Sequence, residues 1–157
     1  QNLIDNWHKG DRRGRSAAMN MVITETGAAK AVAKALPVMQ GKLTGNAIRV
    51  PTPDVSMAIL NLQLENAPAD KDQVNAFLKD MSLNSPLRKQ IDYVDSPDVV
   101  STDLVGSRRA GVVDGLATIV NNSSVVLYVW YDNEFGYSCQ VVRVMARMAD
   151  ISMLQLP

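Results

Sequence analysis

Two runs of β-branched residues in the second half of the chain constrain its fold more than any other feature. They cover residues 111–120 and 125–131, and only the polar segment Asn121-Asn-Ser-Ser124 separates them. Val, Ile and Thr favour strands, and a short polar connection between two such runs is typical of a β-hairpin. The sequence therefore predicts an antiparallel strand pair here, around which the other elements must be arranged.

Two further segments have the pattern of extended chain. Residues 46–50 end at Pro51, and residues 55–65 form a longer apolar run. Within the longer run the apolar positions alternate up to Ile59 and then continue in the opposite phase from Leu60. This change of phase predicts either a strand that is covered on both faces or a strand that contains a bulge.

Three segments predict helices. Residues 27–36 are rich in strong helix formers, and Pro37 and Gly41 follow them. A second helix follows the capping-box residues Asp70 and Gln73, and its predicted buried face consists of Val74, Phe77, Leu78 and Met81. The third is a C-terminal helix over 138–149. Hairpin-linked strands with separate helices predict an α+β fold, with an antiparallel or mixed sheet and helices packed on one face.

Composition limits the classes of function. A chain of 157 residues with 46% hydrophobic content is long enough for one core, so we expect a single domain over 1–157. Sixteen basic residues balance sixteen acidic ones, and no apolar run is long enough for a membrane span. We therefore expect neither a nucleic-acid nor a membrane partner. Cys139 has no second cysteine to pair with, which favours a reducing, cytoplasmic location.

The first residues indicate a cut inside a longer chain. They contain no initiating Met, and no cationic stretch followed by an apolar one, so they do not have the pattern of a signal peptide.

Three short segments have residue types that suit an oxyanion. Arg13 lies in a basic loop, Thr26 and Gly27 precede a predicted helix, and Arg49 ends a predicted strand. Guanidinium groups bind phosphate in a bidentate manner, and the N-terminus of a helix attracts anions. Each segment also has a plainer interpretation: a solvated basic loop, an N-cap formed by Thr26, and a protein carboxylate that pairs with Arg49.

Five ordered blocks make the pattern specific. They are Thr26-Gly-Ala-Ala-Lys-Ala-Val, Gly41-Lys-Leu-Thr-Gly45, Arg49-Val-Pro-Thr52, Val100-Ser-Thr-Asp103 and Trp130-Tyr-Asp-Asn-Glu-Phe-Gly-Tyr-Ser138. In this order and at these spacings they resemble the phosphorylating glyceraldehyde-3-phosphate dehydrogenases, from the loop after the family's catalytic histidine to its C-terminal helix.

The resemblance implies a reaction and two anion sites. Such an enzyme oxidises glyceraldehyde 3-phosphate on a cysteine, passes hydride to NAD, and uses inorganic phosphate to release 1,3-bisphosphoglycerate. By the same resemblance, Arg13, Thr26 and Gly27 belong to the site of the attacking phosphate. Arg49 matches the arginine that serves the substrate phosphate and lies close to both sites.

The resemblance also implies contacts with the cofactor and with other subunits. Asn133 matches the residue that holds the nicotinamide carboxamide, and Tyr137 matches the tyrosine beside that ring. Residues 1–20 correspond to a loop that lines the cofactor site and a subunit interface of a homotetramer. Asp5-Asn6-Trp7 stands where NAD-specific relatives often have a proline, so the choice between NAD and NADP stays open.

Several parts of such an enzyme are absent from this sequence. It contains neither the family's Ser-Cys-Thr-Thr-Asn-Cys segment nor a G-x-G-x-x-G turn, and we interpret neither Cys139 nor His8 as catalytic. We therefore expect no catalytic residue and no turnover in the chain alone. Two alternatives are a domain of the related erythrose-4-phosphate dehydrogenase and a non-catalytic oligomerisation module.

Overall fold

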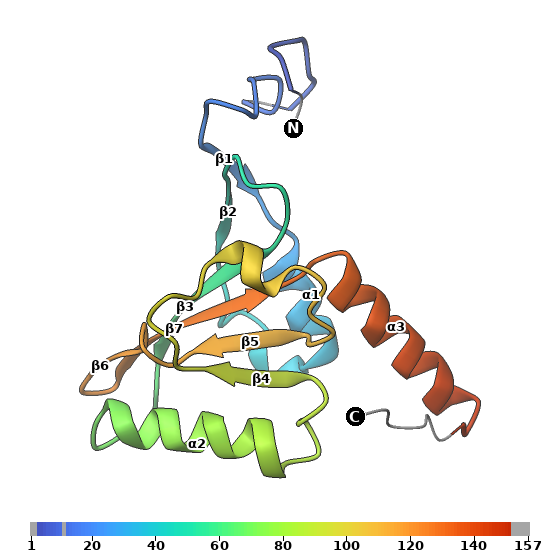
Figure 1. Ribbon diagram of the computed structural model, residues 1–157. Coiled ribbons are helices and arrows are strands. Elements are labelled where there is room, and N and C mark those ends of the chain that lie inside the picture. The colour runs from blue at the N-terminus through green and yellow to red at the C-terminus, as the bar shows by residue number, and fades with distance from the viewer. Residues whose placement is uncertain (1–2, 11, 152–157) are drawn as a thin grey trace. The chain divides into compact units, whose positions relative to one another are not determined.

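The computed structural model describes residues 3–10 and 12–151. By its internal contacts the chain divides into two compact units, Gln1–Pro53 and Asp54–Pro157. Figure 1 shows the helices and strands that belong to these units. The single domain over 1–157 stays a prediction.

The first unit is built on a short antiparallel ladder. Strand β1 (Val22–Glu25) pairs with β2 (Asn46–Arg49). Between them lie helix α1 (Ala28–Ala35) and the 3-10 turn η1 (Pro37–Met39). The prediction of a helix over 27–36 is confirmed, and α1 ends where Pro37, which has no N–H to continue it, fixes the chain direction.

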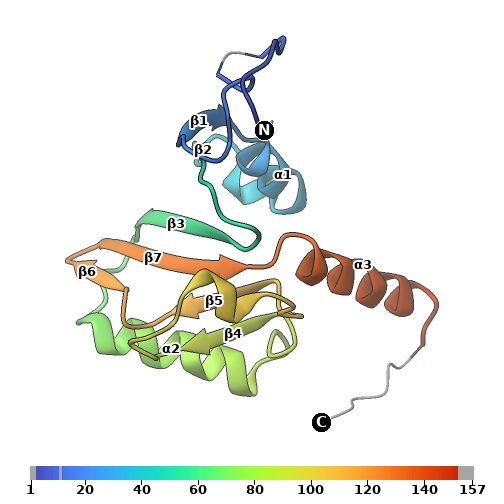
Figure 2. The same cartoon turned by 45° about the horizontal axis from the view of Figure 1, so that its top comes forward.

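The second unit contains a mixed five-stranded sheet. Its strands are β3 (Ser56–Gln63), β4 (Ile91–Val94), β5 (Gly111–Asp114), β6 (Ile119–Asn121) and β7 (Ser124–Tyr131). The order is β3-β7-β5-β4, with β6 also paired to β7; only β4 and β5 run parallel. This confirms the predicted α+β class with a mixed sheet, and helix α2 covers one face of it (Figure 2).

The predicted hairpin is present, but its first strand is interrupted. β6 and β7 pair around Asn122, whose φ of 53° is the left-handed conformation that Asn tolerates in tight turns. The predicted strand over 111–120 divides into β5 and β6 at a turn in which the Asp114 carboxylate accepts the Ala117 N–H at 3.2 Å. A Cβ at Gly115 would overlap the Tyr93 hydroxyl, so glycine is required at this break.

Strand β3 lies at the edge of the sheet. Its register with β7 runs without interruption from Ser56 to Gln63, so the predicted bulge is absent. Ile59 is 54% exposed and Leu60 41% exposed, on opposite faces of the strand. The prediction of a strand covered on both faces is also wrong for the described residues, because side chains on both faces of β3 are exposed.

Helix α2 (Lys71–Asn84) packs along β4. It is attached to the turn after β5, because the Asn75 amide donates to the Gly115 carbonyl at 2.8 Å. Of the four residues predicted to form a buried face, Val74, Leu78 and Met81 are half-buried and Phe77 is 63% exposed. The only described residue of the helix that is buried is Ser82, so the covered stripe is narrower than the apolar pattern suggests.

The N-terminus of α2 offers a test of local stability. Asp70 accepts the Gln73 N–H at 2.8 Å, and the Gln73 amide oxygen accepts the Ala69 N–H at 2.6 Å. Asp70→Ala is expected to lower the free energy of unfolding by about 1 kcal/mol, as measured by urea denaturation followed by circular dichroism. Asp72→Ala in the same turn is the control, since Asp72 makes no capping bond. Equal losses in the two variants would contradict the capping role.

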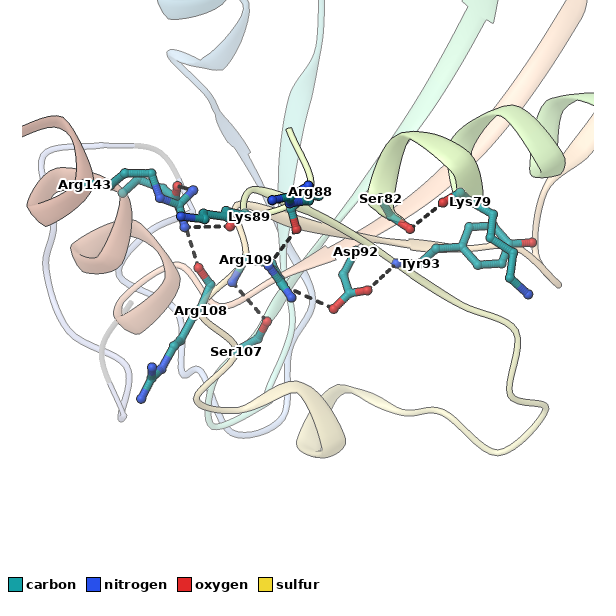
Figure 3. A network of polar contacts seen from close by, with 11 residues as sticks. Lys79, Ser82, Arg88, Lys89, Asp92, Tyr93, Ser107, Arg108, Arg109 and Arg143 are labelled. Atoms are coloured by element: carbon teal, nitrogen blue, oxygen red, sulfur yellow. Dashed lines mark hydrogen bonds and ion pairs between the residues drawn. The ribbon is translucent and has the colours of Figure 1, made fainter. Parts of the chain in front are cut away.

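Helix α3 (Phe135–Met148) begins before the predicted start at residue 138. The Asp132 carboxylate accepts the Phe135 N–H at 2.7 Å, which starts the helix earlier than its apolar periodicity indicates. Arg143 then donates to the Lys89 carbonyl at 2.6 Å, and Gln140 to the Arg108 carbonyl at 3.0 Å (Figure 3). These bonds attach the middle of α3 to the loops around it.

Across residues 3–10 and 12–151, no helix combines the length and the apolar character that a bilayer crossing demands.

Candidate functional site

The residues predicted to bind anions all lie in the first unit, and the β1–β2 ladder orders some of them. Arg49 pairs with Val22, so their side chains share a face of the ladder. Thr24 lies on the same face by strand alternation, whereas Thr26 lies just beyond the last residue of the strand, Glu25. Arg49 and Thr26 therefore stand at opposite ends of the ladder.

Thr26 and Gly27 form the start of α1. The Thr26 hydroxyl accepts the Ala28 N–H at 3.2 Å, but the N-cap residue of α1 is Gly27 and no side chain among the described residues caps the helix, so the plainer interpretation of Thr26 as the N-cap is wrong. A Cβ built at Gly27 would meet no atom within 4 Å, so the start of the helix is open to a ligand. The first N–H groups of any helix lack partners within it and carry the positive end of its dipole. The start of α1 can therefore accept an anion.

Arg49 is exposed at the end of β2. Its neighbours Ile48 and Val50 are themselves exposed, so they do not remove it from water. Within the described part of the chain, no carboxylate forms an ion pair with Arg49. Its guanidinium group therefore keeps its donors for a partner from outside these residues.

Arg13 lies in a loop with its own internal contacts. The Asp5 carboxylate accepts the Ser16 N–H at 2.6 Å and the Arg15 Nε–H at 3.2 Å. His8 accepts the Gly10 N–H at 2.8 Å. None of these loop contacts involves the Arg13 guanidinium, which makes no ion pair across the described residues.

The three predicted anion ligands are not in contact with one another. Thr26 is four residues beyond Val22, the partner of Arg49, which corresponds to about 13 Å along the ladder. Among the described residues no hydrogen bond joins Arg13, Thr26 and Arg49. Their convergence on one phosphate stays a prediction.

Thr24 is a polar residue that sequence reasoning missed. Its side chain is 7% exposed, and its hydroxyl has no hydrogen-bond partner among the described residues. A buried hydroxyl without a partner is costly, so it marks a place where a polar ligand or water fits. The one signal for Thr24 in the sequence is its place two residues before Thr26.

The predicted cofactor residues lie at the start of α3 in the second unit, where Asp132 fixes the backbone. Asp132 is 2% exposed and accepts the N–H groups of Gly106 at 2.8 Å, Glu134 at 3.0 Å and Phe135 at 2.7 Å. These bonds, that of Gly106 first, hold the pKa of Asp132 below its usual value although burial opposes them. A charged carboxylate therefore holds the turn that carries Asn133.

Asn133 and Tyr137 are both exposed, and Tyr137 is 69% exposed. The Asn133 amide oxygen accepts a hydrogen bond from the Ser56 hydroxyl at 3.0 Å. An exposed amide and an exposed ring near a fixed turn suit the polar edge and the flat face of a nicotinamide. Sequence reasoning did not find Ser56, because the contact spans 77 positions.

The backbone just before Ser56 is strained. Val55 has a φ of 67°, which is unfavourable for a β-branched residue. Burial of its side chain and a hydrogen bond of 2.7 Å from its N–H to the Asp54 carboxylate hold it there. Strain of this kind persists only where the surroundings fix the conformation.

The pair Arg108-Arg109 has a structural role. Arg109 forms an ion pair with Asp92 at 3.2 Å and donates to the Arg88 carbonyl at 2.8 Å (Figure 3). Arg109 thus attaches its loop to the start of β4, and only Arg108 projects into solvent without a partner among the described residues.

Comparison with known proteins agrees with this fold and these blocks. The profile of the family described as "Glyceraldehyde 3-phosphate dehydrogenase, C-terminal domain" matches residues 1–133. A glyceraldehyde-3-phosphate dehydrogenase-like protein of Pseudomonas aeruginosa is 70% identical over 97% of this chain, which covers 33% of that relative. The cytosolic glyceraldehyde-3-phosphate dehydrogenase of Ginkgo biloba is 46% identical over 90% of the chain, which covers 41% of it.

The chain thus spans between a third and two fifths of the length of these relatives. The family match covers most of the residues discussed above, including Arg13, Thr26, Arg49 and Asn133. This chain belongs to the glyceraldehyde 3-phosphate dehydrogenase family and corresponds to its C-terminal domain.

Proposed function

We propose that this chain is the substrate domain of a phosphorylating, NAD(P)-dependent glyceraldehyde-3-phosphate dehydrogenase. The observation that carries the proposal is a set of exposed donors at the two ends of the β1–β2 ladder: Arg49, which makes no ion pair among the described residues, and Thr26 with the open start of α1. A guanidinium group, a hydroxyl and free N–H groups are the donors that phosphoryl oxygens accept from.

In this proposal the donors divide between two phosphoryl groups. Thr26, Gly27 and Arg13 hold the inorganic phosphate that cleaves the thioester, and Arg49 holds the phosphate of the aldehyde substrate. Positioning of both reactants turns a bimolecular attack into an effectively intramolecular one, which is a major source of rate enhancement. The cysteine nucleophile and its histidine base belong to a part of the longer protein that this chain does not contain.

The second unit contributes to the cofactor site. Asn133 donates its amide N–H to the nicotinamide carboxamide, and the ring of Tyr137 lies beside the nicotinamide. When bound, the cofactor supplies the hydride acceptor; the protein supplies its position and orientation. The protein acts as a homotetramer in the cytoplasm.

The test is an assay of the full-length protein with glyceraldehyde 3-phosphate, NAD or NADP, and inorganic phosphate. We expect reduction of the dinucleotide that depends on phosphate, and none with the present chain alone. Erythrose 4-phosphate is the discriminating substrate. A preference for it, with no dependence on inorganic phosphate, would refute the proposal in favour of erythrose-4-phosphate dehydrogenase.

One observation supports assembly as a second candidate function. Among the described residues β3 leaves one edge unpaired and exposes Ile59 and Leu60. An unpaired strand edge with apolar side chains is suited to association with another chain. Light scattering of the isolated chain would give the mass of a dimer or tetramer in that case, and the mass of a monomer would exclude it.

A further inference from the structure

The contact between Ser56 and Asn133 has the geometry of a positioning interaction. Ser56 is the first residue of β3 and pairs with Tyr131 at the end of β7. Asn133 lies two residues beyond Tyr131, in the turn between β7 and α3, so the end of β7 brings it close to Ser56. The Ser56 hydroxyl donates to the Asn133 amide oxygen at 3.0 Å.

Other residues fix the backbone next to both partners of this contact. Asp132 fixes the backbone after Asn133, because it binds the N–H groups of Glu134 and Phe135. On the other side, the buried and strained Val55 fixes the direction in which β3 begins. The one freedom left to Asn133 is rotation of its side chain, and the Ser56 hydroxyl restrains that rotation.

The contact leaves one group of the amide unused. With the oxygen bound to Ser56, the Asn133 Nδ2 group has two N–H donors and no acceptor among the described residues. We propose that Ser56 is a positioning residue for cofactor binding, which holds Asn133 so that Nδ2 donates to the carbonyl oxygen of the nicotinamide carboxamide. This inference rests on the proposed function, since it requires Asn133 to contact the carboxamide.

The first measurement is the dissociation constant of NAD for the full-length protein, by isothermal titration calorimetry. Ser56→Ala should raise this constant roughly three- to tenfold, the usual cost of ordering one polar side chain on binding. Ser56→Thr keeps the hydroxyl and should restore the constant to within about twofold of the original. The KM for the aldehyde should stay unchanged, because Ser56 contacts no group proposed to bind that substrate.

A matched control lies at the other end of the same strand pair. Ser124 donates its hydroxyl to the Gln63 amide oxygen at 2.9 Å, and these two residues pair in the β3–β7 register. Ser124→Ala removes a contact of the same kind far from Asn133. Ser124→Ala should leave the affinity for NAD unchanged. If it lowers this affinity as much as Ser56→Ala does, the loss is a general effect on the two strands and the proposal is overturned.

Two further measurements separate this inference from the proposed function. If Asn133→Ala does not weaken NAD binding, the proposed cofactor contact fails and the inference with it. If Asn133→Ala weakens binding but Ser56→Ala does not, only the inference is overturned. In the double variant, Ser56→Ala should add no loss to that of Asn133→Ala, because it acts through that side chain. An additive loss would show that Ser56 acts elsewhere.

A cofactor analogue provides a direct readout of the hydrogen bond. In thionicotinamide adenine dinucleotide a weakly accepting sulfur replaces the carboxamide oxygen. The Asn133 Nδ2 group can therefore form only a weak hydrogen bond with this analogue. The effect of Ser56→Ala on the dissociation constant of this analogue should fall below about twofold. An undiminished effect would contradict the proposed direction of the amide.

Discussion

In the full-length enzyme, Arg49→Ala is expected to lower kcat/KM for the phosphorylated aldehyde by roughly 100-fold or more, with a higher KM and a lower turnover. Arg49 makes no ion pair among the described residues, so its donors are available to a phosphoryl group. Its loss removes a charge-assisted contact and the orientation of the reacting group. Steady-state kinetics with the aldehyde and phosphate varied separately measure both effects.

Two variants control for charge and for shape. Arg108→Ala removes an exposed arginine from the other unit and should leave kcat/KM within about twofold, since exposed charges contribute little. Arg49→Lys keeps the charge but loses the bidentate geometry, and should recover only part of the activity. Unchanged kinetics in Arg49→Ala would remove this residue from the mechanism.

The largest effect on stability is expected at Asp132. Its carboxylate accepts N–H groups from Gly106, Glu134 and Phe135, and the side chain is 2% exposed. Asp132→Ala leaves these donors without partners at the start of α3. The loss should be about 3 kcal/mol of unfolding free energy, by the cost of unpaired buried groups. Urea denaturation followed by the fluorescence of Trp130, on neighbouring β7, measures it.

Two substitutions test whether charge or hydrogen bonding dominates at this position. Asp132→Asn keeps the shape and one acceptor oxygen, but places an N–H₂ group near a donor, so it should lose a smaller amount than Asp132→Ala. Asp95→Ala removes a carboxylate whose ion pair with Lys79 is exposed, and should cost less than about 1 kcal/mol. If Asp95→Ala costs as much as Asp132→Ala, the capping role is wrong.

The same carboxylate gives stability a dependence on pH. Its folded-state pKa lies below the usual 3.8, so the unfolded state binds the proton more readily. The contribution of Asp132 is therefore complete above the unfolded pKa and is lost as pH falls through the folded one. Acid unfolding should move to higher pH in Asp132→Asn. An unshifted acid transition would show that this proton is not coupled to folding.

Local patterns in the sequence predicted the elements whose causes are local. Helices α1 and α2, the cap at Asp70 and the β6–β7 hairpin follow from residue preference, a side-chain cap and a turn of few residues. Strands β1 and β4 were not predicted. Each has only four residues, and β4 depends on the distant β5 for its hydrogen bonds, which no local pattern records.

The same distinction holds for the candidate site. Ordered sequence blocks identified the family, which the comparison confirmed, and they named Thr26 and Arg49 as anion ligands. They could not show that Thr24 is buried without a partner or that Ser56 binds Asn133, because both facts depend on chain segments brought together by folding. Phe77 is the opposite case: its helical spacing predicted a buried side chain, whereas the packing leaves it exposed.

The position of β7 in the sheet has a consequence for how the protein is made. β7 joins β3 on one side to β5 and β6 on the other, yet it is the last of these strands in the chain. During translation Ser56 of β3 is synthesised more than sixty residues before Tyr131, its partner in β7. Until then β3 and β6 have no strand partner among the described residues, although β4 and β5 can pair with each other. The sheet is therefore completed only late in translation, and the nascent chain needs protection from aggregation.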